Sequence, residues 1–403
     1  MASELPDFRS PEFLDDHIHS ILAFYHPRCI DRQRGGYFQH FRDDGSIYDA
    51  DTRHLVSSTR FVFNYATAAR RYGNQEYREA AAHGVHFLRE EHRNPVTGGY
   101  AWVLDRDAVG DDTNHCYGLA FVLLAYACAL RARLPEAEQW LHETFELMER
   151  RFWSETDQLY RDEIGGDWQR VSPYRGQNAN MHTCEAMLAA FEASADSRYL
   201  ERAHTLARRV TRDLAASAGG LVWEHYDETW RPDWDYNRDN PKHLFRPWGF
   251  QPGHQTEWAK LLLTLEQHRP EEWMLPTART LFDRALDQAW DREHGGICYG
   301  FDLKGNICDG DKYFWVQAET FAAAARLAMR TGEERYWDWY QRIWEYAWQH
   351  FVDHRYGAWY RILNRQNQKY DDLKSPAGKT DYHTMGACYD VLGVIEGGCA
   401  PRV

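Results

Sequence analysis

Three histidines in this sequence stand in local settings that suit acid-base chemistry, and the first lies in Gly249-Phe-Gln-Pro-Gly-His-Gln-Thr-Glu-Trp258. In that stretch a Pro-Gly turn precedes His254, Glu257 follows three residues later, and a leucine-rich run begins at residue 261. This pattern predicts that His254 and Glu257 share one face near the start of a helix. Imidazole gains and loses a proton near neutral pH, and we expect Glu257 to orient the His254 ring and stabilise its charged form.

The other two histidines occupy comparable positions. His182 ends the stretch Gln177-Asn-Ala-Asn-Met-His182, and His383 ends Lys379-Thr-Asp-Tyr-His383. Each leads into small and apolar residues, which is typical of the first turn of a buried helix. We therefore expect the three helix starts to converge, which would place two acid-base groups within reach of one substrate.

A short motif recurs along the chain and predicts the elements that hold these histidines. It combines a glycine pair with alternating aromatic or β-branched residues, and its copies follow one another at intervals of roughly 60 to 75 residues. The glycines allow positive φ at a tight turn, and the residues after them indicate a short extended segment. The third copy lacks the glycines; the six copies are 35–40, 98–103, 159–162, 219–224, 295–300 and 357–362.

Helical patterns flank every copy of the motif. Amphipathic outer helices are expected before it, for example at 140–153, 281–290 and 337–351. Inner helices richer in alanine are expected after it, at 59–70, 117–130, 182–193, 257–265, 315–328 and 383–395. Six such hairpins predict an all-α fold, an (α/α)6 barrel with short extended segments in its loops, as a single domain over residues 1–403. An open solenoid is the competing layout; closure is favoured because six units account for the whole chain and polar residues recur at the inner helix starts.

Composition excludes several classes of partner. The formal net charge is -14 and the basic residues are scattered, so we expect neither nucleic-acid nor membrane binding. The chain starts without a basic and apolar leader, which predicts a cytoplasmic protein. Its eight cysteines, at positions 29, 116, 128, 184, 298, 308, 388 and 399, show no zinc-site spacing, and we interpret them as reduced packing residues. We expect no metal and no cofactor, and a monomer or homodimer.

The predicted inner helix starts collect side chains that suit a carbohydrate. Aromatic faces pack against a sugar ring, while Asn, Arg and Glu bind its hydroxyl groups. The aromatic and charged segment 231–250, just before the His254 helix, is long enough to act as a lid. The candidates are Arg60, Tyr117, Asn178 with His182, His254 with Glu257, Trp315 with Glu319, and His383.

Together, these motifs resemble the N-acylglucosamine 2-epimerase superfamily, which contains 2-epimerases of acylglucosamine and cellobiose and aldose-ketose isomerases of mannose. The Asn-Ala-Asn-Met-His182 form is most similar to the mannose isomerase branch. The resemblance covers essentially the whole chain. It implies that His254 and His383 are the acid-base pair and that Arg60 binds the substrate and the enediolate oxygen. It also implies sugar contacts from Tyr117, Asn178, His182, Glu257, Trp315 and Glu319.

Two chemical outcomes share the first step of that route. A base removes the proton from C2 of the open-chain sugar, and reprotonation at C1 gives a ketose whereas reprotonation at C2 gives an epimer. We expect a monosaccharide substrate and conversion of D-mannose to D-fructose, with D-lyxose to D-xylulose as a related possibility and 2-epimerisation as the alternative. A glycoside hydrolase using Glu257 and Glu319, or a barrel that binds sugar without turnover, are less favoured because the histidine motifs would then have no task.

Overall fold

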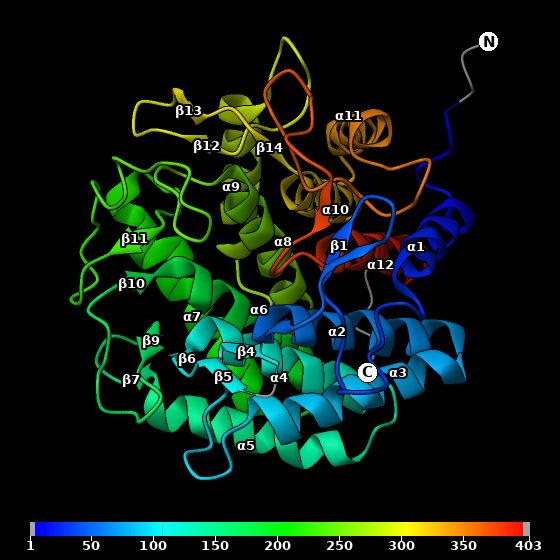
Figure 1. Ribbon diagram of the computed structural model, residues 1–403. Coiled ribbons are helices and arrows are strands. Elements are labelled where there is room, and N and C mark those ends of the chain that lie inside the picture. Colours follow the sequence, from blue (N-terminus) through cyan, green and yellow to red (C-terminus); the bar gives the residue numbers. More distant parts are fainter. Residues whose placement is uncertain (1–4, 107, 398–403) are drawn as a thin grey trace.

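Two concentric rings of helices make up the computed structural model, which describes residues 5–106 and 108–397. Outer and inner helices alternate along the chain, and the colours of Figure 1 follow one another around the ring. The outer helices are α1 (Pro11–Tyr25), α3 (Gln75–Phe87), α5 (Glu136–Arg151), α7 (Ser197–Arg208), α9 (Met274–Ala289) and α11 (Glu334–His350). The inner helices are α2 (Leu55–Tyr72), α4 (Cys116–Arg131), α6 (Gln177–Ser194), α8 (Pro252–His268), α10 (Phe314–Thr331) and α12 (Tyr382–Gly397).

The ring is closed. Each inner helix packs against the next, and the last inner helix, α12, contacts both α2 and α1 (Figure 1). The prediction of an (α/α)6 barrel is therefore confirmed, and the open solenoid is excluded. That the chain forms a single domain stays a prediction.

Burial explains the two helix types. Inner helices have neighbours on nearly every side, so residues all around α10, including Ala322, Ala323 and Ala324, are fully buried. An outer helix buries only one face, as α11 does with Tyr336, Tyr340, Ile343, Trp344 and Ala347. Small side chains thus let six inner helices approach one axis, while large aromatic side chains fill the space between the rings.

Short antiparallel strands connect outer to inner helices, as the repeated motif predicts. Strands β3, β6, β10 and β14 lead directly into α2, α4, α6 and α10, so the sheets lie at the N-terminal ends of the inner helices. The strands are β1 (His40–Arg42), β2 (Ile47–Asp49), β3 (Thr52–His54), β4 (Val103–Asp105), β5 (Ala108–Asp111), β6 (Asn114–His115), β7 (Trp153–Ser154), β8 (Leu159–Tyr160), β9 (Glu163–Ile164), β10 (Arg175–Gly176), β11 (His225–Tyr226), β12 (Gly300–Phe301), β13 (Ile307–Asp309), β14 (Lys312–Tyr313), β15 (Ile362–Leu363) and β16 (Leu373–Ser375).

The glycine pairs form tight turns that touch the next outer helix. Gly295 and Gly296 have φ of +73° and +78°, a region that favours glycine. A Cβ at Gly296 would lie 2.4 Å from the Tyr346 ring of α11. The turn therefore needs glycine both for its backbone angles and for this close approach.

Three inner helices begin earlier than predicted. Helices α2, α6 and α8 start at Leu55, Gln177 and Pro252, four or five residues before the expected starts. The predicted Pro-Gly turn before His254 is wrong, because Pro252 and Gly253 form the first turn of α8. Proline has no N–H to donate and its φ is already helical, so it fits the first position of a helix.

Side-chain amides tie the repeated motif to three inner helices. Gln317, the fourth residue of α10, accepts a hydrogen bond from Ile297 N at 3.1 Å and donates to Ile297 O at 3.1 Å. Asn180 and Gln255, the fourth residues of α6 and α8, hold the backbone of Tyr160 and Val222 in the same way. These amide clamps fix the position of each helix start along the barrel axis. They thereby also position the side chains of the residues that follow.

Two further sequence predictions can be compared with the structure. The seven cysteines that the structure describes are free, and five of them are buried, as packing residues should be; Cys399 lies outside the described residues. Across the same residues, none of the helices combines the length and the apolar character needed to cross a membrane.

Candidate active site

The candidate residues occupy two layers at the N-terminal end of the inner ring. The outer layer holds second or third residues of their helices: Tyr117, Asn178, His254, Trp315 and His383. One turn deeper lie four sixth residues: Arg60, His182, Glu257 and Glu319. Their burial follows this order, since Tyr117, Asn178 and Trp315 are partly exposed whereas all four deeper residues are buried. A ligand would reach the group from the side of the strands.

His254 is oriented by a carboxylate that the sequence analysis missed. Its Nδ1 lies 2.9 Å from Glu224 Oε2, and the amide of Gln177 donates to the same oxygen at 3.0 Å. Glu224 lies on the extended segment just before β11 and is 4% exposed. Since a carboxylate only accepts, His254 carries its proton on Nδ1, and its Nε2 has no protein partner among the described residues. The expectation that Glu257 orients this ring is wrong.

His383 has the same construction on α12, which is separated from α8 by α10 in the inner ring. Its Nδ1 lies 2.7 Å from Glu319 Oε1, so this ring also carries its proton on Nδ1. The other oxygen of Glu319 is 2.6 Å from Lys260 Nζ. Burial keeps the His383 ring neutral, because it lowers the pKa to about 4 despite the Glu319 carboxylate, which raises it. A neutral ring can serve as a base at Nε2.

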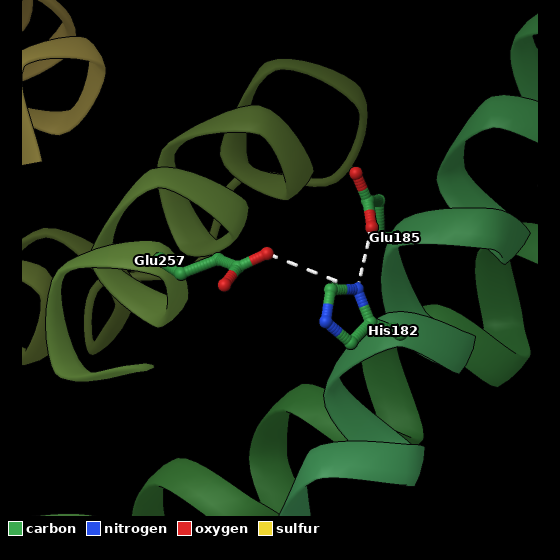
Figure 2. A group of neighbouring side chains, drawn as sticks. All are labelled: His182, Glu185 and Glu257. Atoms are coloured by element: carbon green, nitrogen blue, oxygen red, sulfur yellow. Dashed lines mark hydrogen bonds and ion pairs between the residues drawn. The ribbon is translucent and has the colours of Figure 1, made fainter. Parts of the chain in front are cut away.

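Glu257 faces His182 rather than His254. His182 Nδ1 lies 2.9 Å from Glu185 Oε2 and 3.8 Å from Glu257 Oε1, and Figure 2 shows the ring between these two carboxyl groups. Glu185 also accepts from the Tyr382 hydroxyl. Glu257 is fully buried, and among the residues that the structure describes neither of its oxygens has a hydrogen-bond partner.

The electrostatics favour a protonated Glu257. Its burial, with the charges of Glu319 and Glu185 nearby, raises its pKa well above the usual value. Burial by itself would also raise the pKa of Glu319, but Lys260 and the hydrogen bond from His383 lower it to about 2. A protonated Glu257, which can donate a hydrogen bond, therefore lies beside ionised carboxylates, which can only accept.

Arg60 is the cation in the deeper layer. Its guanidinium donates to Gly378 O and to the Tyr117 hydroxyl at 3.1 Å, and its Cζ lies 4.4 Å from the centre of the Phe121 ring. In the part of the chain that the structure describes, its Nε has no hydrogen-bond partner. A guanidinium stays charged at any physiological pH, so this group can stabilise a developing oxyanion.

Trp315 contacts both catalytic candidates. The centre of its ring lies 5.1 Å from that of His254 and 5.6 Å from that of His383. Tyr117 packs edge to face on His182 at 5.1 Å. Asn178 Oδ1 is buried, has no hydrogen-bond partner in the described part of the chain, and can accept from a ligand hydroxyl. The structure thus brings all nine predicted residues to one end of the barrel, while their roles stay predictions.

Glu224, Glu185 and Lys260 are the residues of this group that sequence reasoning missed. Glu224 ends the fourth copy of the repeated motif and directly follows Leu-Val-Trp. An acidic residue at the end of this apolar run is a sequence signal for a functional carboxylate. Glu185 and Lys260 are each the ninth residue of an inner helix, on the same face as His182 and Glu257 one turn earlier. Helical spacing therefore could have identified both.

The side chains also allow a test for a metal site. Ligand atoms of His182, Glu185 and Glu257, and of Glu257, Glu319 and His383, lie within 4.8 Å of one another. However, His182 and Glu185 already bond each other, and the Lys260 ammonium occupies one oxygen of Glu319. A metal ion would have to displace these interactions, so the donor set fits it poorly.

A cavity of about 550 Å³ lies on the other side of this site. It is lined by the C-terminal halves of the inner helices, and it reaches inward to Glu185, Lys260, Glu319 and Tyr382. It holds none of the outer-layer residues Tyr117, Asn178 or Trp315. The charged layer at its inner end therefore separates it from the two histidines.

Comparison with known proteins adds independent information. The profile of the N-acylglucosamine 2-epimerase family matches residues 36–387. A D-mannose isomerase of Marinomonas mediterranea is 57% identical over 391 residues, which cover 97% of this chain and 99% of that protein. The crystal structure of a D-mannose isomerase matches with a TM-score of 0.95 at 56% identity, covering 97% of this chain and 100% of that one. A cellobiose 2-epimerase of Bacteroides fragilis is 21% identical over 388 residues, 93% of this chain and 96% of that protein.

Proposed function

Because the chain belongs to the N-acylglucosamine 2-epimerase family, we propose that it is an aldose-ketose isomerase that interconverts D-mannose and D-fructose. The match to D-mannose isomerases spans nearly the full length of both chains, whereas the epimerase relatives are far less similar. The observation that carries the chemistry is the pair of histidines, His254 and His383. Each has its Nδ1 hydrogen-bonded to a buried carboxylate, and its Nε2 has no protein partner within residues 5–106 and 108–397.

The reaction uses these groups in two proton transfers. A histidine Nε2 takes the proton from C2 of the open-chain aldose, and the electron pair of the C–H bond forms the cis-enediolate. Arg60 stabilises the negative oxygen of this intermediate. The imidazolium then delivers its proton to C1, and the proton of the C2 hydroxyl passes to the oxygen on C1. The C1 oxygen thereby becomes a hydroxyl and the C2 oxygen becomes the ketose carbonyl.

The remaining candidates hold the sugar in place. Trp315 contacts both histidines and presents a face against which the carbon chain of the sugar packs. Asn178 and His182 bind hydroxyl groups, and protonated Glu257 donates to a sugar oxygen. Glu319 acts through His383 instead, because both of its oxygens are already engaged by protein groups.

Proton NMR in D₂O tests the proposal. Purified protein is incubated with D-mannose without added metal, and N-acylmannosamine and cellobiose are incubated in parallel. We expect fructose from mannose, with deuterium at C1. Formation of a C2 epimer carrying deuterium at C2 would instead identify an epimerase, and the absence of exchange on every sugar would refute both.

Alanine at His383 separates catalysis from binding. We expect His383→Ala to abolish turnover while mannose binding, measured by calorimetry, changes little. A hydrolase that uses Glu257 and Glu319 would keep its activity in this variant, and a sugar-binding barrel would change only in affinity.

Chelation tests the expected independence from metals. We expect full activity after dialysis against EDTA, because Arg60 and the histidines supply every charge that the reaction needs. Loss of activity followed by recovery with Mn²⁺ or Zn²⁺ would contradict this.

We also propose a cytoplasmic location, supported by the free and mostly buried cysteines.

A further inference from the structure

A continuous chain of charged groups runs from His383 through the ring of inner helices. His383 bonds Glu319 Oε1 at 2.7 Å, and Lys260 Nζ lies 2.6 Å from Glu319 Oε2. Lys260 is also 3.3 Å from Asp390 Oδ2, and Arg326 donates to Asp390 Oδ1 at 2.6 Å. Lys260 and Glu319 are both buried, so little water screens the contact between them.

We propose that Lys260 is a positioning residue that keeps Glu319 ionised and thereby holds His383 with its proton on Nδ1 and a free lone pair on Nε2. The role of that lone pair in proton transfer rests on the proposed function. The effect on the His383 tautomer does not, because it follows from the contacts alone.

The crowding of acidic groups explains why a cation is needed. Burial and neighbouring carboxyl groups both favour a protonated Glu319. Were Glu319 protonated, its O–H would donate to His383 Nδ1, and the ring proton would move to Nε2. A ring in that tautomer has no lone pair for the substrate. The other charged and titratable groups facing this cluster are Arg60, His182, Glu185, Glu257 and Tyr382.

The two histidine–carboxylate pairs differ in this respect. Glu224, which orients His254, is held by the neutral amide of Gln177 and has no cation within ion-pair distance among the described residues. Glu319, by contrast, lies beside a second carboxyl group, because its charge interacts with that of Glu257. The Lys260 ammonium thus lies at the His383–Glu319 pair, where a neighbouring carboxyl group opposes ionisation of Glu319.

Lys260 can be changed without touching the sugar. It is the ninth residue of α8 and lines the cavity of about 550 Å³ behind the site, whereas the proposed sugar contact Trp315 is the second residue of α10. Two helical turns separate these levels. Substitution should therefore affect kcat much more than KM.

Three variants test the proposal. Lys260→Gln keeps a donor to Glu319 but removes the charge, Lys260→Met removes both, and Lys260→Arg restores the charge. We expect the Gln and Met variants to lose about 10- to 100-fold in kcat at neutral pH with KM little changed. Ionised Glu319 would return at higher pH, so the acidic limb of the kcat profile should move to higher pH. The Arg variant should keep the wild-type profile.

A matched control removes another ion pair between the same two helices. Glu266 on α8 pairs with Arg330 on α10 at 2.7 Å, away from the contacts among Lys260, Glu319 and His383. Glu266→Gln should leave both kcat and its pH profile unchanged. A shift equal to that of Lys260→Gln would show that any α8–α10 pair has this effect, and would overturn the proposal.

The tautomer of His383 gives a readout that needs no turnover. In ¹⁵N-histidine NMR, we expect His383 to carry its proton on Nδ1 in the wild type and in Lys260→Arg, and on Nε2 in Lys260→Gln at neutral pH. An unchanged tautomer in the Gln variant would overturn the proposal. If the wild type fails to isomerise any sugar, the proposed function fails, while this measurement still decides the role of Lys260.

Discussion

Glu224 and His254 are thirty residues apart in the chain, yet their contact fixes which nitrogen of the ring can react. The carboxylate accepts from Nδ1, so Nε2 is left with the lone pair. The same arrangement recurs at Glu319 and His383. At both positions the carboxylate acts on the histidine rather than on the substrate, which separates orientation from proton transfer.

A substitution at Glu224 should therefore impair the chemical step. In Glu224→Gln the side-chain amide can donate to Nδ1, which would place the proton of His254 on Nε2. We expect kcat to fall by about 10²- to 10⁴-fold, as for other enzymes in which the carboxylate behind a histidine is made neutral, with a small change in KM. Steady-state kinetics with mannose measures both.

The control for that variant lies on the same segment. Glu228 is exposed, and Glu228→Gln should behave like the wild type. An active Glu224→Gln variant would show that the ring finds its reactive tautomer without this carboxylate.

At the scale of elements, the amide clamps set the height of the inner helices. Gln317 satisfies both backbone groups of Ile297, which is fully buried. In Gln317→Ala those groups lose their partners, and we expect the free energy of unfolding to fall by about 1–3 kcal/mol. Urea denaturation measures this loss. Gln341→Ala on outer helix α11, where the amide donates to Glu345 at an exposed position, should cost far less. Equal losses would contradict the role of the clamp.

Polar contacts from Lys242, Pro247 and Arg246 hold the loop 231–250 against the barrel, and contacts of this kind would hold a lid closed. Arg246 stacks on Tyr174 at 3.8 Å, donates to the Tyr236 hydroxyl at 3.2 Å, and pairs with Glu163. If the loop closes over bound sugar, Arg246→Ala should loosen the closed state by about 1 kcal/mol and raise KM about five-fold. Kinetics of this variant beside Arg231→Ala, which removes an exposed arginine of the same loop, tests the role of a lid; equal KM values in both would argue against it.

The elements also show what the sequence could predict. The recurring motif predicted six hairpins and a closed barrel, because each hairpin must bury an apolar face against its neighbours. The sequence predicts later starts for α6 and α8 than the structure shows, because polar residues such as Asn178 and His254 in a first turn have the composition of a loop. Likewise, the partner of His254 was sought at helical spacing. It comes from another element, and no periodicity within α8 predicts a contact made by the fold.

At the scale of the whole molecule, closure of the ring depends on contacts between the first and last repeats. The indole of Trp359 donates to His17 Nε2 at 2.8 Å, and the Tyr25 hydroxyl donates to Asp381 at 2.7 Å. Arg71, at the end of α2, pairs with Asp15 of α1 and with Glu396 of α12. Except for the pair of Arg71 with Asp15, which are 56 residues apart, these contacts join residues more than 300 positions apart, so the barrel gains them only when it is complete.

The bond between His17 and Trp359 makes this closure sensitive to acid. The indole N–H needs the lone pair of His17 Nε2, and burial lowers the pKa of His17 to about 4, below its ordinary value of 6.5. Between these values the unfolded chain binds the proton and the folded one does not. The contribution of His17 to the free energy of unfolding is therefore fully present above pH 6.5, and it falls by about 3 kcal/mol as the pH drops toward 4.

Gln at position 17 can accept from the indole without titrating. We expect urea unfolding of His17→Gln to lose about that much less between pH 7 and pH 4 than the wild type, while His19→Gln, on the exposed face of α1, keeps the wild-type slope. Equal slopes in all three proteins would place the acid sensitivity elsewhere in the barrel.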